Sequence, residues 1–184
     1  MLKAFSMIES AHHPFVELAR TAIKAYVREQ KIIRAPEDLP PEMGERAGVF
    51  VSLHRRGELR GCVGTIEPQR ENLAAEIIEN AISAATRDPR FPPVETNELD
   101  SLEISVDVLT PPEPIDSMQR QDPQKHGLIV QSTRDPLKRG LLLPDLENID
   151  TTAKQLYYTR VLKAGITDPN EPVELFRFEV KRYH

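Results

Sequence analysis

The sequence predicts an α+β protein, with a mixed, largely antiparallel sheet and flanking helices. Some segments carry apolar residues at helical spacing, and other, shorter segments have the patterns of strands, several of them joined as hairpins. Clustered hairpins with helices packed against the sheet favour this class over a doubly wound parallel fold. A similar order of strands and helices occurs in both halves, without a repeat in the sequence itself. We therefore expect one domain over residues 1–184, with a larger and a smaller lobe divided near residues 110–125.

Apolar side chains at helical spacing predict helices at about residues 13–30 and 71–86. In the first, charged side chains occupy the opposite side, which is typical of an amphipathic helix on a core. The second is expected to end at Asp88-Pro89, because the residue before a proline avoids helical backbone angles.

A further helix is expected at about residues 152–164. Thr152 and Gln155 resemble a capping box, and Gly165 stands where a helix C-terminal glycine belongs. The residues expected on its buried face are Ala153, Tyr157, Val161 and Ala164.

Strand patterns occur on both sides of these helices. Residues 48–53 and 58–66 surround the turn Arg56-Gly57 and predict a hairpin. Residues 102–108 alternate apolar and polar side chains, as a half-buried strand does. Pro111, Pro112 and Pro114 are expected to end that strand, with a polar loop to Lys125. Shorter strands are predicted at residues 127–130, 140–143 and 175–180.

The charge and the length of the apolar runs argue against two classes of binding partner. The formal net charge of −5 argues against nucleic acid, because phosphate binding usually needs a clustered basic surface. No apolar run approaches the ~20 residues that span a bilayer, so no membrane partner is expected. A protein partner or a small-molecule ligand stays open.

The single cysteine excludes an intramolecular disulfide and a Cys-rich zinc site. His12 and His13 diverge on a helix, and no carboxylate or cysteine completes a ligand set nearby, so we expect no metal. Without a Gly-x-Gly-x-x-Gly or Walker-type loop, we expect no nucleotide or other cofactor. Residues Met1 to Ser10 lack an uninterrupted hydrophobic region and make a poor signal peptide, which points to a reducing, cytoplasmic setting.

The segment from Leu59 to Thr65 holds that cysteine, Cys62, between Gly61 and Gly64. Glycines weaken strand interiors, so two of them beside one thiol indicate that something approaches the backbone closely. On a regular strand, Arg60 would share a face with Cys62 and lower its pKa, as a nucleophile requires. The alternative is that Cys62 is a buried apolar filler.

Other candidate site residues lie elsewhere in the chain. His126 begins a predicted strand and could serve as base to a Cys62 nucleophile, or simply as a structural hydrogen-bond donor. Asp88 and Arg90 follow the second helix. Asp88-Pro89 is good helix-terminating chemistry, while Arg90 could hold an anion in a cleft.

Several segments together resemble the AMMECR-type domain family, named after a human chromosomal region deleted in a syndrome of Alport disease and midface hypoplasia. The resemblance covers about Phe15 to Tyr183, and Leu-Arg-Gly-Cys-Val-Gly-Thr at residues 59–65 is its hallmark. The other matching segments are Gly48-Val49-Phe50-Val51, Asp88-Pro89-Arg90-Phe91, His126-Gly127-Leu128, Gly140-Leu141-Leu142-Leu143-Pro144 and Lys163-Ala164-Gly165.

The resemblance implies an α+β domain with two lobes or repeats and a cleft near Cys62. Relatives occur beside a Memo-like dioxygenase-related domain and a radical S-adenosylmethionine protein, which implies a shared pathway. No reaction is attached to the family, so a fold assignment does not supply an activity.

Two hypotheses about function follow. In the first, a cleft around the motif binds a ligand or catalyses a cysteine-dependent reaction, with Cys62, His126 and Arg60 as catalytic candidates. The ligand-binding candidates are Gly61, Gly64, Thr65, Asp88 and Arg90. In the second, the chain is a noncatalytic protein-interaction module, and Cys62 fills space.

Overall fold

A computed structural model describes residues 12–184, so the expectation about Met1 to Ser10 concerns residues outside this range. The chain divides into two compact units. Among the described residues, unit 1 comprises 12–108 and 182–184, and unit 2 comprises 109–181. Both units combine helices with antiparallel strand pairs, so the predicted α+β class is confirmed.

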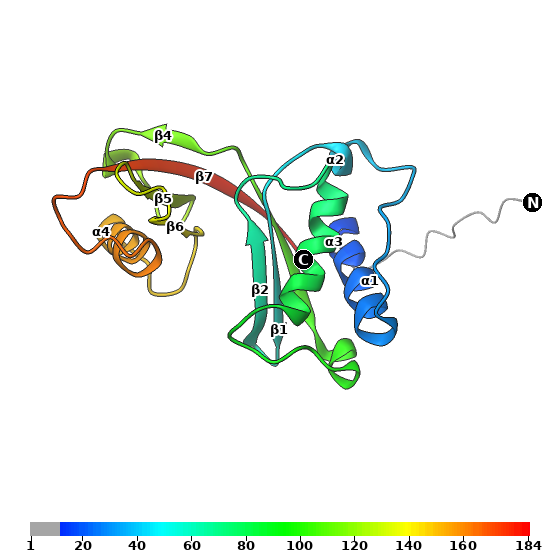
Figure 1. Ribbon diagram of the computed structural model, residues 1–184. Helices are drawn as coiled ribbons and strands as arrows, with labels where there is room; N and C mark the ends of the chain where they lie inside the picture. The colour runs from blue at the N-terminus through cyan, green and yellow to red at the C-terminus, as the bar shows by residue number, and fades with distance from the viewer. Residues whose placement is uncertain (1–11) are drawn as a thin grey trace, which may run out of the picture. The chain divides into compact units, whose positions relative to one another are not determined.

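Unit 1 packs helices on one face of an antiparallel sheet with strand order β2-β1-β3. Helix α3 contacts β1 and β2 and lies against α1, so both helices share one core with the sheet (Figure 1). The elements are α1 (Pro14–Glu29), α2 (Pro41–Gly44), β1 (Val49–Arg55), β2 (Glu58–Thr65), α3 (Leu73–Thr86), the 3-10 helix η1 (Thr96–Ser101) and β3 (Glu103–Leu109), whose last residue begins unit 2.

Strand β1 shows how the alternating pattern builds this core. Val49, Val51 and Leu53 are fully buried on the face that carries the helices, whereas the residues between them are half-buried on the other face. Arg56 and Gly57 both have positive φ, 54° and 79°, as a two-residue hairpin turn of the I′ type requires. The predicted hairpin is confirmed.

The two predicted helices of unit 1 are also confirmed. His13 caps α1 by accepting the N–H of Phe15 on its ring nitrogen, and Gln30 ends the helix in the left-handed conformation. Asn72 caps α3 by accepting the N–H of Ala75. These side chains satisfy backbone groups that the first and last turns leave unpaired.

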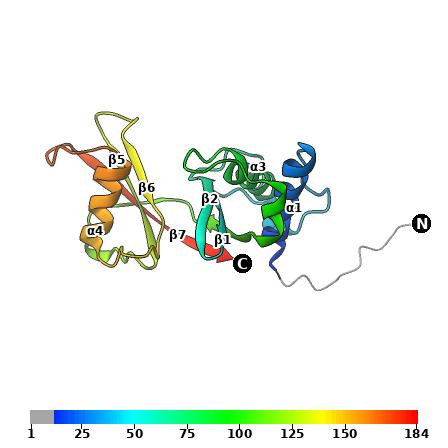
Figure 2. The ribbon, with the colours of Figure 1, turned by 90° about the horizontal axis from the view of Figure 1, so that it is seen from below.

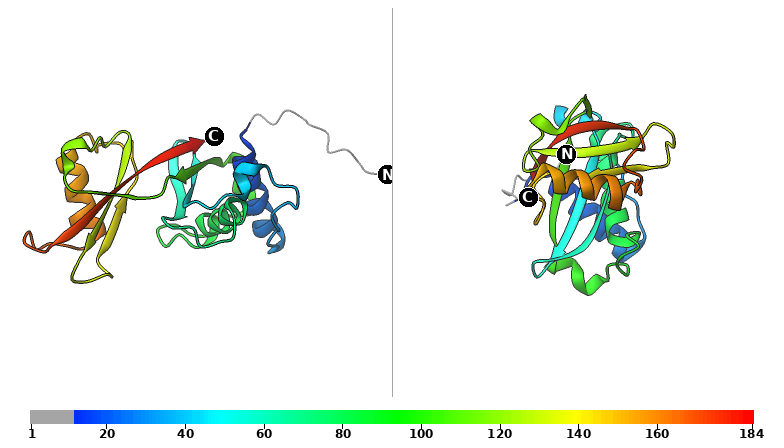
Figure 3. Two further views of the ribbon diagram at one scale, coloured as in Figure 1. Left: turned by 90° about the horizontal axis from the view of Figure 1, so that it is seen from above. Right: turned by 90° about the vertical axis from the view of Figure 1, so that its left-hand side faces the viewer.

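Unit 2 carries one helical segment on a sheet with strand order β6-β5-β7-β4. Figures 2 and 3 show the helical segment, in orange, on one face of β5 and β6. The elements are β4 (Glu113–Ile115), the 3-10 helix η2 (Met118–Arg120), β5 (His126–Ser132), β6 (Arg139–Leu142), α4 (Thr152–Tyr157), the π-helix η3 (Tyr158–Lys163) and β7 (Val173–Tyr183), whose last residues belong to unit 1.

Strand β4 lies where the sequence predicts a loop. It contains Pro114, and it pairs with β7 alone, at the edge of the sheet. A proline is tolerated there because its missing N–H removes no bond from a second neighbour. Pro114 therefore marks an edge strand, and Pro111 and Pro112 lie between β3 and β4.

The helix expected at residues 152–164 has a different cap and a different buried face. Its N-cap is Thr151, which accepts the N–H of Lys154, so the predicted capping box at Thr152 is wrong. Ala164 is buried as predicted, but Ala153 and Tyr157 are exposed. The helix instead buries Gln155 and Thr159 completely.

Candidate functional site

The β1–β2 hairpin positions Cys62. Ser52 of β1 lies directly opposite it and donates its hydroxyl to Sγ at 3.2 Å. Ser52 is in turn paired with Ser105 of β3, so three small polar side chains form a row across the sheet. Gly61, the neighbour of Cys62, faces α3, so this row lies on the sheet face opposite the helices.

A clamp formed by Asp88 and Arg90 holds the backbone of Cys62. Strand β2 has one strand neighbour, β1, so its outer edge needs other hydrogen-bond partners. Asp88 Oδ2 accepts the N–H of Cys62 at 2.9 Å, and Arg90 Nη2 donates to the carbonyl of Cys62 at 3.3 Å. Arg90 also donates to both oxygens of Asp88, at 3.0 and 2.8 Å. The clamp thus supplies the donor and acceptor that an adjacent strand would supply.

The electrostatics of this site favour a neutral thiol. Burial raises the pKa of Cys62, and it outweighs the hydrogen bond from Ser52 and the charge of Arg90, which favour the thiolate. The carboxylates of Asp107 and Asp88 raise it further. Arg90, in contrast, holds the pKa of the Asp88 carboxyl well below its usual range. At pH 7 the site therefore combines a neutral thiol with a charged clamp.

Arg60 is engaged away from the thiol. Leu53 pairs with Gly61 and His54 with Leu59, so Arg60 is the extra residue of a β-bulge, and the regular strand assumed for this position is wrong. Its guanidinium binds both oxygens of Glu98 at 2.9 Å. Arg60 thereby lowers the pKa of Glu98 to about 2. The guanidinium whose charge favours the Cys62 thiolate belongs to Arg90.

The two glycines of the motif are in contact with the chain itself. A Cβ added at Gly61 would lie 2.2 Å from the carbonyl oxygen of Ala84 in α3, and one at Gly64 would lie 2.3 Å from the ring of Phe50. Both glycines are therefore required by packing within unit 1. The group that approaches the backbone at Gly61 is helix α3.

Thr65, the last residue of the motif, belongs to a buried network. Its hydroxyl donates to Glu76 Oε1 at 2.5 Å and accepts from Asn80 at 3.2 Å. Glu76 also accepts the N–H groups of Gln69 and Arg70, which anchors the loop after β2 on α3. The sequence gives no hint of Glu76, since it occupies an ordinary polar position of a helical pattern.

His126 lies in unit 2, where its ring and backbone are held in place. Its Nδ1 accepts the N–H of Asp122 at 3.3 Å, and its carbonyl accepts from Gln155 at 2.8 Å and Gln121 at 3.2 Å. Its Nε2 lies 3.7 Å from Glu179, beside a cavity of about 310 Å³ that Arg177 also lines. The structure thus groups Cys62 with Asp88 and Arg90, and places His126 in a separate hydrogen-bond network of unit 2.

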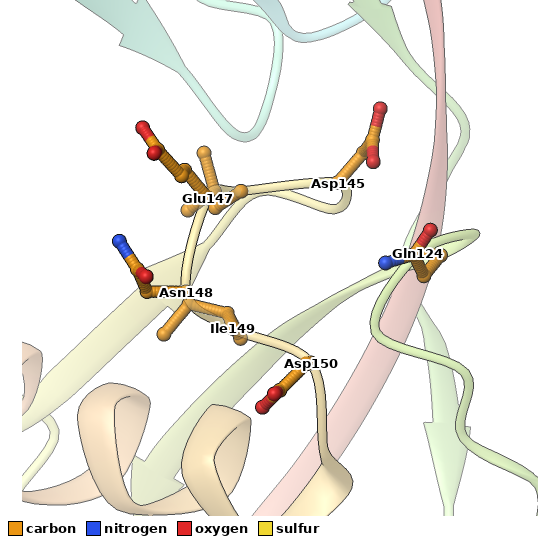
Figure 4. A pocket seen from close by; sticks show the side chains of 7 residues that line it. Gln124, Asp145, Glu147, Asn148, Ile149 and Asp150 are labelled. Atoms are coloured by element: carbon orange, nitrogen blue, oxygen red, sulfur yellow. The ribbon is translucent and has the colours of Figure 1, made fainter.

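A second cavity of unit 2, of about 300 Å³, lies at the loop after β6, between Gln124 and residues 145–150. Figure 4 shows the carboxylates of Asp145 and Glu147 pointing in different directions, and Asp150 turned toward the helix, where it pairs with Lys154 at 2.8 Å. Within residues 12–184, no group of three or more His, Cys, Asp or Glu side chains could hold a metal ion.

The fold and the clamped cysteine motif define the class of protein. The chain matches the AMMECR1 family over residues 16–183, and it belongs to that family. None of the helices in the described part of the chain is long and apolar enough to cross a membrane.

Relatives extend over nearly the whole chain. A protein of Thermotoga maritima is 50% identical over 173 residues, which are 93% of this chain and 97% of that protein. A Clostridium acetobutylicum protein is 42% identical over 92% of this chain, but the match covers only 36% of its own length. The crystal structure of an uncharacterized protein from Pyrococcus horikoshii is similar with a TM-score of 0.81 at 35% identity, and the match covers 91% of this chain and 88% of that one.

Proposed function

We propose that the chain is a noncatalytic binding module whose recognition surface in unit 1 is built around Cys62. The observation that carries this proposal is the state of Cys62: a neutral, half-buried thiol on a strand whose backbone is clamped on its outer edge. A neutral thiol is a poor nucleophile, since the thiolate is the reactive form. A clamped strand with small polar side chains, however, is well suited to binding, because it loses little conformational entropy when a ligand associates.

Within this proposal the residues of the motif have distinct roles. Cys62 and the half-exposed guanidinium of Arg90 contact the ligand, and Asp88 positions both of them. Gly61, Gly64 and Thr65 fix the shape of β2 through their contacts with unit 1. Arg90 retains donors that can bind an anionic or carbonyl group.

The partners in this proposal are the Memo-like and radical S-adenosylmethionine proteins of the pathway implied by the family resemblance, in the cytoplasm. The Clostridium relative supports a modular role, because this domain corresponds to 36% of a longer chain there. A domain that occurs joined to further chain is typical of a module that works with another domain.

A second candidate function is cysteine-dependent catalysis, with Cys62 as nucleophile. It is favoured by the hydrogen bond from Ser52 and the charge of Arg90, both of which lower the pKa of the thiol. For this function, the two effects together would have to outweigh the burial of the thiol.

The rate of alkylation by iodoacetamide as a function of pH separates the two functions. Because Cys62 is the single cysteine, labelling reports on this site alone, and Cys62→Ser supplies the blank. For the binding module we expect a rate that rises only at a higher pH than for a free thiol of pKa about 8.5, because burial raises the pKa of Cys62. A rate that is already at its plateau at pH 7 would establish a thiolate and favour catalysis.

The binding part of the proposal is tested by titration calorimetry with the purified Memo-like and radical S-adenosylmethionine proteins. We expect at least one complex, and we expect Arg90→Ala to weaken it about tenfold. Glu58→Ala, an exposed change on the same strand, serves as the control. No complex with either protein, or equal affinity for Arg90→Ala and wild type, would contradict the proposed surface.

A further inference from the structure

In the helical segment of unit 2, α4 with η3, two polar side chains lie in the interior and three large apolar or aromatic side chains lie outside, although Leu156 packs against the apolar cluster. Gln155 and Thr159 are fully buried, whereas Tyr157, Tyr158 and Leu162 are 54%, 39% and 58% exposed. A helix that only covers a sheet shows the opposite arrangement, because burying such side chains is favourable by about 1.5–3 kcal/mol each. We call the surface formed by Tyr157, Tyr158 and Leu162 the tyrosine face.

Hydrogen bonds explain why Gln155 and Thr159 occupy the interior. Gln155 donates to the carbonyl of His126 at 2.8 Å and accepts from Gln121 at 3.0 Å. The hydroxyl of Thr159 donates to the carbonyl of Gln155 at 2.7 Å. The side chains of Gln155 and Thr159 are therefore both paired, and exchanging either for an apolar side chain would remove these hydrogen bonds.

The π-helix fixes this orientation. The N–H of Ala164 donates to the carbonyl of Thr159, five residues earlier, at 2.9 Å. Strand β6 approaches this turn closely at Gly140, where an added Cβ would lie 2.4 Å from the oxygen of Thr159. Since the backbone of η3 is held against β6, the segment cannot rotate to bury the tyrosine face.

The charges around the tyrosine face are all of one sign along the segment. Residues 152–163 contain Lys154, Arg160 and Lys163 and no acidic residue. Lys154 pairs with Asp150, and Arg160 donates to backbone carbonyls of the loop before β7. Within residues 12–184, Lys163 has no ion-pair partner, so a cation stands free beside Leu162.

We propose that the tyrosine face is a docking surface for an acidic, amphipathic helical segment of a partner protein. Tyrosine is enriched at interfaces, where its ring supplies contact area at a low cost in conformational entropy. The edge-on pair Tyr157 and Tyr158, with ring centroids 6.0 Å apart, offers an aromatic platform beside Leu162. Acidic side chains of the segment would pair with Lys163, and its apolar side chains would cover the rings. This surface lies in unit 2 and is independent of the proposed role of Cys62 in unit 1.

The test uses a displayed library of helical peptides, selected against the full chain and then measured with purified peptide. We expect enrichment of peptides with acidic residues beside an apolar stripe. We expect the double variant Tyr158→Ser/Leu162→Ser to weaken the selected peptide at least about tenfold. Leu137→Ser is the matched control, because Leu137 is 94% exposed in the turn between β5 and β6. Exposed positions tolerate such changes, so the variants should unfold at the wild-type urea concentration.

Charge reversal makes the test specific. Lys163→Glu should weaken an acidic peptide, and a peptide with one Glu replaced by Lys should regain affinity for that variant. Selected peptides without acidic residues, or with equal affinity for wild type and the double variant, would overturn the proposal. It would also be overturned by an empty selection, by self-association that the double variant abolishes, or by binding of the wild-type chain to anionic vesicles in place of peptides.

Discussion

The two units pack helices on a sheet with different kinds of side chain. In unit 1, α1, α3 and the sheet share one core of Phe15, Ile23, Ile77 and many other buried apolar residues. In unit 2, the apolar cluster consists of Leu128, Val130, Ala164 and Ile166, and the helix adds the buried amide of Gln155 and the hydroxyl of Thr159. Both interiors contain paired polar groups, since α3 also buries Glu76 and Asn80, but the apolar cluster of unit 1 is much larger.

In each unit, the side chains that are buried determine which side chains remain on the surface. Unit 1 buries its apolar side chains between the helices and the sheet. The polar row with Cys62 lies on the opposite face of that sheet. In unit 2, the inward position of the helix is occupied by Gln155, which binds β5, so Tyr157 and Leu162 are exposed. Both units share one device, because Gly61 and Gly140 each allow a strand to approach a helix backbone.

The largest effect is expected where the close packing of unit 1 is disturbed. Gly61→Ala would bring a methyl group against the carbonyl of Ala84, and backbone atoms on both sides cannot move aside cheaply. We expect the free energy of unfolding, from urea titration followed by circular dichroism, to fall by about 3 kcal/mol. Gly44→Ala is the control, since nothing lies within 4 Å of that position. Equal stability of the two variants would show that α3 does not press on β2.

An intermediate effect is expected from the ion pair that holds the bulge of β2. Glu98→Gln removes the charge that binds Arg60 and should cost about 2 kcal/mol at pH 7. In the folded chain the pKa of Glu98 is about 2, below its ordinary 4.5, so the unfolded chain binds more protons between these values. Wild-type stability should therefore fall as the pH falls from about 4.5 toward 2, and Glu98→Gln should show a smaller fall over the same range. Parallel curves for the two proteins would contradict this.

The smallest effect contrasts a buried polar residue of unit 2 with an exposed apolar one. Gln155→Leu should destabilise by about 1–2 kcal/mol although leucine is more apolar, because Gln121 and the carbonyl of His126 each lose a partner. Tyr157→Gln should change stability by less than about 0.5 kcal/mol. Thermal unfolding of both variants measures the difference. A stabilised Gln155→Leu variant together with a destabilised Tyr157→Gln variant would mean that the helix buries the opposite face.

Residue patterns alone were sufficient to predict the α+β class, the hairpin with its Arg56-Gly57 turn, the helices of unit 1 and the strand that carries Cys62. These features follow from local rules, namely the period of apolar side chains and the preference of glycine for positive φ. The resemblance carried by residues 59–65 also identified the family. The same local rules could not tell whether the glycines beside Cys62 serve a ligand or the packing of the chain.

The assembly of the site depends on contacts between residues that are far apart in the chain. The hydrogen bond from Cys62 to Asp88 joins residues 26 positions apart. Arg60 binds Glu98, 38 positions away, and not the thiol. Gln155 is buried in place of Tyr157 because it binds a backbone carbonyl in β5 and because the π-helix η3 follows it. These pairings depend on which backbone groups remain unpaired after the strands and helices have packed together. The spacing of residues along the sequence does not contain this information.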